Sequence, residues 1–342
     1  QSQFHVFGVT TIIIALITYC MAPIVATQPS WFYVMVVVTV LLLTELKHTF
    51  TEFAQRMKND EMITLAKFLA ISGIILPMLP HKNLIPDINL TPYSIWLATV
   101  VVSGISYLSY LLKRYVFHES GTLVSGIIGG LYSSTATISV LARKSRKASE
   151  LEATDYVAAM LLAVSMMFLR FMILILIFSR EIFLSIYPYL LTMAVVAAIV
   201  AWFIHSRQKR PEDQPAETEE DDSSNPLEFK VALIFAVLFV IFTFLTHYTL
   251  VYAGTGGLNL LSFVSGFSDI TPFILNLLQN TGSVAALIIT ACSMQAIISN
   301  IMVNMFYALF FAGKGSKLRP WILGGFGVVI TCNLVLLLFF YI

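Results

Sequence analysis

The sequence predicts an all-α membrane protein, a polytopic bundle of membrane-spanning helices, from three observations. Its 342 residues are 58% hydrophobic and 11% charged, with a mean hydropathy of +0.85. Apolar stretches of about 20 residues recur along the chain, and each is long enough to cross a hydrocarbon core of roughly 30 Å. Their periodicity is helical, unlike the alternating segments of about ten residues in an outer-membrane barrel. We therefore expect a multi-pass protein of a prokaryotic inner (cytoplasmic) membrane, surrounded by lipid.

The N-terminal part, residues 1–92, is expected to hold three spans and one helix on the membrane surface. Its predicted elements are spans at 5–26 and 31–46, a surface helix at 47–60 and a span at 62–79. The surface helix is charged but carries apolar residues at helical spacing, as interfacial helices do. The third span is expected to end at Pro80, because a proline disfavours helix in the residue before it.

The rest of the chain predicts two membrane repeats, at 93–205 and 227–342. A polar linker with an acidic run, 206–226, joins them and is too poor in apolar residues to fold alone. Each repeat reads as a span, a Gly/Ser-rich segment and two further spans. The six spans are 94–117, 155–179, 184–204, 228–252, 283–312 and 319–342. Short echoes in a shared order support the repeat, such as Val124-Ser125-Gly126 and Val264-Ser265-Gly266.

The two Gly/Ser-rich segments, 121–143 and 258–278, are predicted to be re-entrant or broken. Glycine lets backbones approach closely, and interrupted helix at membrane depth is tolerated only inside protein or beside a cavity. The residues expected to act as hinges are Gly126, Gly129, Gly130, Gly266 and Pro272. The alternative is a small-residue helix that crosses the membrane and packs tightly against its neighbours.

The distribution of Lys and Arg favours the re-entrant alternative. If every segment crosses, the basic cluster at 143–147 falls outside, although short cytoplasmic loops carry the excess of positive charge. If 121–143 and 258–278 turn back, nearly all Lys and Arg residues lie inside. Each repeat then has three crossings, an odd number, so the second repeat is inverted relative to the first. Inverted repeats whose interrupted segments meet near the midplane are typical of transporters.

Polar and charged residues in the spans are the candidates for a substrate site, since such residues are costly in a membrane. They are Ser133, Ser134, Thr135, Thr137, Arg170, Asp269, Thr271, Asn300 and Asn304. Arg170 and Asp269 are expected to meet, as a structural pair or as a substrate-binding pair; alternatively Arg170 reaches out to the outer interface. Asn300 is expected to approach the tip of 121–143, unless the asparagines only bond helices together.

Enzymatic chemistry has no support in the sequence. No nucleophile elbow, Walker loop, HExxH motif or carboxylate pair is present, so we expect no enzyme and no cofactor. Asp269 is the single candidate for a metal ligand. The net charge of +1 gives no reason to expect nucleic-acid binding.

Three stretches resemble a known family. SGIIGGLYSSTATISVLARKSR (125–146) resembles the G-G-L-x-S-S-T-A-T signature of the membrane domain DUF4010, and SGFSDITPFILNL (265–277) resembles its second motif. HVFGVTTIIIALITYCMAP (5–23) looks like the later part of an MgtC/SapB unit, to which DUF4010 domains are attached. The resemblance implies an association with survival in low magnesium and with virulence, but no settled activity.

These observations predict a transporter or channel-like permease for a small ion, with alternating access at a midplane site between the two re-entrant segments. A divalent cation is favoured, and a phosphate-like anion is the alternative because Arg170 and exposed helix ends suit one. The rival hypotheses are a non-transporting regulatory protein that binds a membrane partner and a lipid-carrier flippase. A homo-oligomer is a further expectation.

Overall fold

The computed structural model divides the chain into two compact units, 1–63 and 64–342. The described residues are 59–85, 88, 90–117, 121–146, 150–207, 229–279, 284–313 and 316–341, with parts of 15–41. In the first unit, residues 34–41 are helical, inside the predicted span 31–46. Most of the predicted span 5–26, of the surface helix 47–60 and of the linker 206–226 lies outside the described residues. Both predicted repeats belong to the second unit.

The described residues confirm an all-α multi-pass architecture. Eight of their helices are long and apolar enough to cross a membrane, and none of these residues belongs to a strand longer than an isolated bridge. The elements are α3 Asn59–Ala70, η1 Ile71–Ile75, α4 Leu76–Met78, α5 Pro92–Leu111, η2 Leu112–Val116, α6 Thr122–Lys144, α7 Glu150–Phe178, α8 Arg180–Ser206, α9 Phe229–Ser265, α10 Ile270–Gln279, α11 Ala286–Ala312 and α12 Arg319–Tyr341.

Local sequence signals account for several helix ends. A capping box starts α5: Ser94 N–H donates to the Thr91 hydroxyl, and Thr91 N–H donates to the Ser94 hydroxyl. Pro92 occupies the first helical position, where its missing N–H costs no hydrogen bond because a backbone N–H there has no partner within the helix. At the end of α4, Leu79 adopts an extended conformation before Pro80, so the predicted end of the third span is confirmed.

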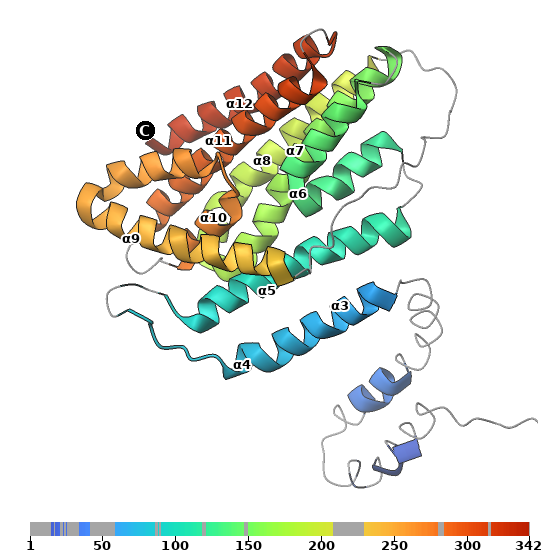
Figure 1. Cartoon of the computed structure of the whole chain (residues 1–342), viewed down its shortest axis with the longest axis vertical. Helices are drawn as coiled ribbons and strands as arrows, with labels where there is room; N and C mark the ends of the chain where they lie inside the picture. The colour runs from blue at the N-terminus through green and yellow to red at the C-terminus, as the bar shows by residue number, and fades with distance from the viewer. Residues whose placement is uncertain are drawn as a thin grey trace, which may run out of the picture. The chain divides into compact units, whose positions relative to one another are not determined.

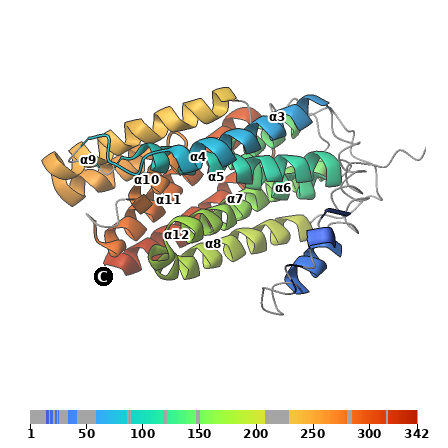
Figure 2. The same ribbon diagram turned by 90° about the horizontal axis from the view of Figure 1, so that it is seen from below.

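Helix α7 packs closely against both α6 and α8, and α7 and α8 run side by side in both views (Figures 1 and 2). Gly126 and Gly130 explain how α6 comes so close to α7. A Cβ at Gly126 would lie 2.3 Å from the Ala159 carbonyl oxygen, and one at Gly130 would lie 2.5 Å from Ala163 Cα. Both glycines therefore act as close-packing positions rather than as hinges.

Helix α6 is broken at Ser133, whose φ of −158° and ψ of 106° are not helical. Across the break, a Cβ at Gly129 would lie 2.5 Å from Thr137 Oγ1. Residues eight apart in an unbroken helix are separated by about 12 Å, at 1.5 Å per residue. The two halves of α6, 122–132 and 134–144, therefore fold back into a helical hairpin (Figure 1).

The second Gly/Ser-rich segment is broken as well. Helix α9 doubles back at Gly254, which has φ 58° and ψ −150° (Figure 1). Its second part, 255–265, leads through the link 266–269 into α10, which has ten residues. Such a helix is about 15 Å long, half of a hydrocarbon core. Segment 258–278 is thus two short helices and a non-helical link.

The same order of elements therefore occurs twice: one long helix, two short ones and two long ones. The sequence echoes do not align with this order. Gly126 lies in the middle of its short helix, whereas Gly266 follows the end of its own. Short strings of Val, Ser and Gly are common in membrane helices. Short sequence identities are therefore weaker evidence for aligning the two repeats than the positions of the helix breaks.

Candidate functional site

The break in α6 is held by Arg170 of α7. Arg170 Nη1 donates a hydrogen bond of 2.8 Å to the carbonyl oxygen of Tyr132, the last residue before the break. This carbonyl lies at the C-terminal, negative end of the first half of α6, which favours a cation. Arg170 Nε is buried and has no hydrogen-bond partner among the described residues. The guanidinium group is therefore fixed on one side and unsatisfied on another.

The hydroxyl residues after the break start the second half of α6. The Ser133 hydroxyl accepts a hydrogen bond from Ala136 N–H at 3.4 Å, as an N-cap side chain does. The next residue, Ser134, is buried. Thr135 is half-buried, and its carbonyl accepts a hydrogen bond from the Ser139 hydroxyl. The first backbone N–H groups of a helix have no partner within it, so Ser134 and Thr135 offer donors at this break.

Asp269 occupies the corresponding position at the second break, just before α10. Its Oδ1 accepts a hydrogen bond of 2.9 Å from Thr271 N–H, and the side chain is exposed. The Asp269 carboxylate also interacts electrostatically with Arg170. The direct hydrogen bond of Arg170 goes to the Tyr132 carbonyl, and a contact between Arg170 and Asp269 stays a prediction.

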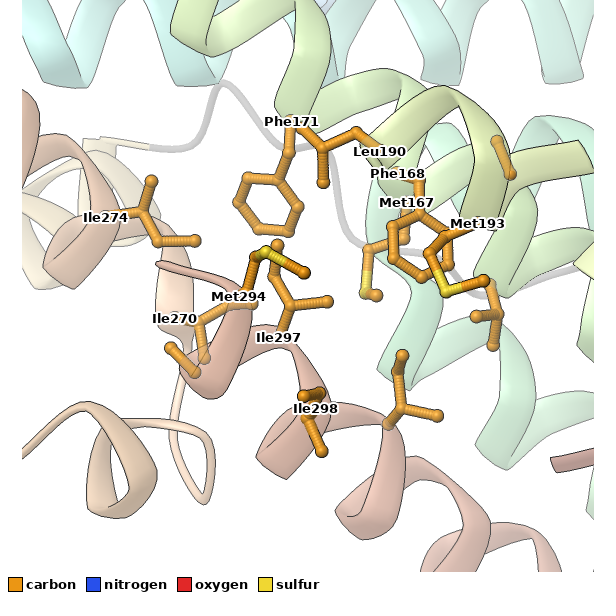
Figure 3. Close-up of a cluster of buried hydrophobic side chains, with 14 of the residues drawn as sticks. Met167, Phe168, Phe171, Leu190, Met193, Ile270, Ile274, Met294, Ile297 and Ile298 are labelled. Atoms are coloured by element: carbon orange, nitrogen blue, oxygen red, sulfur yellow. The ribbon is translucent and has the colours of Figure 1, made fainter. Parts of the chain in front are cut away.

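A buried apolar cluster surrounds the place where α7, α10 and α11 meet (Figure 3). Phe171 of α7 and Ile270 of α10 face the same cluster, together with Met294 of α11. Phe171 follows Arg170 in the chain, and Ile270 follows Asp269. Arg170 and Asp269 are therefore each next in the chain to a residue of one buried cluster.

Helix α11 holds the other end of the second break. Asn300 Nδ2 donates to the Gly266 carbonyl at 3.2 Å, and the Ser299 hydroxyl donates to the Phe263 carbonyl at 2.7 Å. Asn304 Nδ2 donates to Asn300 Oδ1 at 3.1 Å. A Cβ at Gly266 would lie 2.4 Å from the Ser299 side chain, so glycine is needed for this approach.

Asn300 hydrogen-bonds to the second break and to Asn304, because α11 packs its polar face against the end of α9. Helix α11 also packs against α6, and an approach of Asn300 to the tip of α6 stays a prediction. One expectation needs correction. Pro272 does not interrupt a helix. It lies in the first turn of α10, where a missing N–H costs little. Thr271 is buried in the same turn, and Thr137 packs against Gly129.

Sequence reasoning missed Tyr132, which contributes a backbone carbonyl, for which its side chain gives no signal. Ser299 belongs to the polar face around Asn300, but its hydrogen bond to a carbonyl in another helix has no signature in the sequence. The described residues contain no group of three or more His, Cys, Asp or Glu side chains that could hold a metal ion.

Comparison with known proteins places these features in a family. The model of a domain of unknown function, DUF4010, matches residues 100–312. The chain belongs to the DUF4010 family. The matched DUF4010 region runs from α5 to the end of α11, so it contains both breaks and Arg170. An uncharacterized protein of Aquifex aeolicus (strain VF5) is 25% identical over 227 residues, 65% of this chain and 96% of that protein. No solved structure matches the chain.

Proposed function

We propose that this DUF4010 protein is a membrane carrier for a small oxyanion, such as phosphate or sulfate, which binds at Arg170 between the two helix breaks. The observation that carries the proposal is the position of Arg170. It lies within a 25-residue apolar stretch of α7, Thr154–Phe178, and leaves its buried Nε without a partner among the described residues. A charged residue inside a membrane span is costly, and such residues usually mark a substrate path.

The helix ends at the break suit the same chemistry. The N-terminus of a helix attracts anions through its free N–H groups and the positive end of its dipole. The second half of α6 presents such an end at Ser134 and Thr135, next to the carbonyl that Arg170 binds. The planar guanidinium group, with its several N–H donors, matches the geometry of oxyanions better than that of halides.

The expected divalent cation has weaker support. Hard cations prefer several oxygen ligands, with more than one carboxylate in most sites. Asp269 brings one carboxylate to the break, and one of its oxygens already accepts a hydrogen bond from Thr271. The adjacent positive charge of Arg170 opposes a second cation. An anion is therefore the substrate that this arrangement favours.

We further propose that the two short-helix segments re-enter the membrane from opposite faces and that the two sets of helices are inverted repeats. The repeated order of long and short helices supports this proposal, as does the doubling back of α6 and α9 (Figure 1). Half-length helices that meet at the midplane allow alternating access by a rocking of the two repeats. The resemblance of 5–23 to an MgtC/SapB unit lies mainly outside the described residues and stays a prediction.

Uptake by proteoliposomes tests the proposal. Purified protein is reconstituted and supplied with radiolabelled phosphate or sulfate, with labelled chloride and magnesium as comparisons. We expect uptake of an oxyanion well above that of empty liposomes, and no comparable uptake of magnesium. Absence of oxyanion uptake would favour the regulatory hypothesis, and magnesium uptake alone would restore the cation hypothesis. Movement of a lipid-linked phosphate without free phosphate would support a flippase.

A further inference from the structure

Helix α11 presents a row of exposed apolar side chains near its C-terminal end. Phe306 and Phe310 are 61% and 63% exposed, and their ring centroids lie 6.1 Å apart. Residues four apart share one face of a helix, and the exposed Met302 continues this face. Among the candidate spans that the structure describes, α11 is otherwise the most buried. The exposed row, Met302, Phe306 and Phe310, is therefore a local feature of this end of the helix.

Two arginines from the end of α6 lie beside the end of this row. Arg146 Nη2 donates a hydrogen bond of 3.1 Å to the Phe310 carbonyl, and the Arg143 guanidinium group lies 4.3 Å from the centroid of the Phe311 ring. A carbonyl in the last turn of a helix attracts a cation, which explains the position of Arg146. Both arginines are exposed, and the described residues give neither of them a carboxylate partner. Their two positive charges are therefore not neutralised within this part of the chain.

The contacts of the arginines do not explain why the row is exposed. Phe306 and Phe310 belong to the apolar stretch Ala286–Ala312, and in a membrane the neighbours of such side chains are lipid acyl chains. The distribution of Lys and Arg predicts that this end of α11 lies at the cytoplasmic face, whose leaflet carries anionic headgroups. Guanidinium groups bind phosphate oxygens well through paired hydrogen bonds. A phospholipid with a net negative charge therefore complements both parts of the surface.

We propose that the exposed row and the two arginines form a binding site for an anionic phospholipid. The lipid phosphate binds Arg143 and Arg146, and one acyl chain lies along Phe306 and Phe310. Ten residues of helix, about 15 Å, separate Arg143 from the break at Ser133. The inference therefore concerns a second site and does not rest on the proposed function. A soluble phosphate would use the arginines alone, whereas the lipid also contacts the row of α11.

The test uses the whole chain in vesicles of phosphatidylcholine. Phe306→Trp is the fluorescent reporter, after the four native tryptophans are replaced by phenylalanine. Phosphatidylglycerol with brominated acyl chains is added in increasing fractions, because bromine quenches a tryptophan that it contacts. We expect quenching at lower fractions of brominated phosphatidylglycerol than of brominated phosphatidylcholine. Val195→Trp, at an exposed position in the middle of α8, is the matched reporter and should not distinguish the two lipids.

The arginines are tested in the Phe306→Trp protein. A basic residue near a negatively charged membrane surface strengthens binding by about fivefold. Arg143→Gln combined with Arg146→Gln should therefore raise the fraction of brominated phosphatidylglycerol at half-maximal quenching by at least about fivefold. The corresponding double lysine variant keeps both charges and should retain most of the preference. Arg180→Gln, at the exposed start of α8, should behave like the wild type.

Equal quenching of Phe306→Trp by the two brominated lipids overturns the inference, as does a preference that survives the loss of both arginines. Inorganic phosphate in the buffer should leave the quenching unchanged. If inorganic phosphate abolishes the preference for phosphatidylglycerol, the arginines bind a soluble anion and the lipid assignment is wrong.

Discussion

Arg170 Nη1 lies 2.8 Å from the carbonyl oxygen of Tyr132, so a charged side chain of α7 ends the first half of α6. The contact links a residue in the middle of a membrane span to a helix break. Loss of a hydrogen bond between a charged group and a carbonyl costs about 1.5–3 kcal/mol. The same guanidinium group carries the positive charge that we propose binds the oxyanion.

We therefore expect Arg170→Gln to reduce oxyanion uptake by at least about tenfold, because both the charge and the fork of donors are lost. Arg170→Lys keeps the charge and should retain more uptake than Arg170→Gln, but less than the wild type. Initial uptake rates in proteoliposomes measure the effect. Arg180→Gln, at the exposed start of α8, is the control for loss of a positive charge. Wild-type uptake by Arg170→Gln would remove this residue from the site.

The contact between α6 and α7 predicts a sharp difference between two glycines. At Gly126 a Cβ would meet the backbone of Ala159, whereas at Gly104 of α5 it would meet nothing within 4 Å. Gly126→Ala should lower stability by about 1–3 kcal/mol, as overpacking does. Gly104→Ala should be neutral or stabilising by up to about 1 kcal/mol through helix propensity. Thermal unfolding in detergent measures both, and equal melting temperatures would contradict the close packing of α6 on α7.

The turn of α9 predicts a second contrast. Gly254 and Gly256 both face open space, but only Gly254 has a positive φ. An alanine at φ 58° and ψ −150° is strained, and such strain costs of order 1–3 kcal/mol. Gly254→Ala should therefore lower the melting temperature, while Gly256→Ala should not. A Gly254→Ala variant as stable as the wild type would show that α9 does not turn there.

The bonds of Asn300 predict a structural role at the second break. Asn300→Ala removes the donor to the Gly266 carbonyl and the acceptor for Asn304, which leaves buried polar groups unpaired. We expect a loss of about 1–3 kcal/mol in stability. When Asn304→Ala is combined with Asn300→Ala, stability should fall little further, since the two side chains are hydrogen-bonded to each other and act as a unit. Unfolding of the two single variants and the double variant measures this coupling, and full additivity would argue against it.

Much of this architecture follows from the sequence. Glycine and hydroxyl residues in apolar stretches predicted interruptions in 121–143 and 258–278, and the distribution of Lys and Arg favoured the same interpretation. The exact break positions did not follow, because they depend on contacts between helices. Ser133 is non-helical next to a carbonyl held by Arg170, and nothing in its own neighbourhood distinguishes it from Ser134.

The partners of the site residues were harder to predict than the residues themselves. Arg170 and Asn300 were recognisable as costly polar residues in apolar spans. Each of them binds a backbone carbonyl, of Tyr132 and of Gly266, and a carbonyl has no signature in the sequence. Pro272 was misinterpreted for a related reason, since a proline can mark the start of a helix as well as a break.

Protection of a single cysteine tests most directly whether an oxyanion binds at the break of α6. In a background without the native cysteines, Thr135→Cys is modified by a small water-soluble thiol reagent, with and without phosphate or sulfate. The account predicts that one of these anions slows modification of Thr135→Cys, that chloride does not, and that a cysteine at the exposed Glu181 is unaffected. Modification of Thr135→Cys at the same rate with and without either oxyanion would contradict the account.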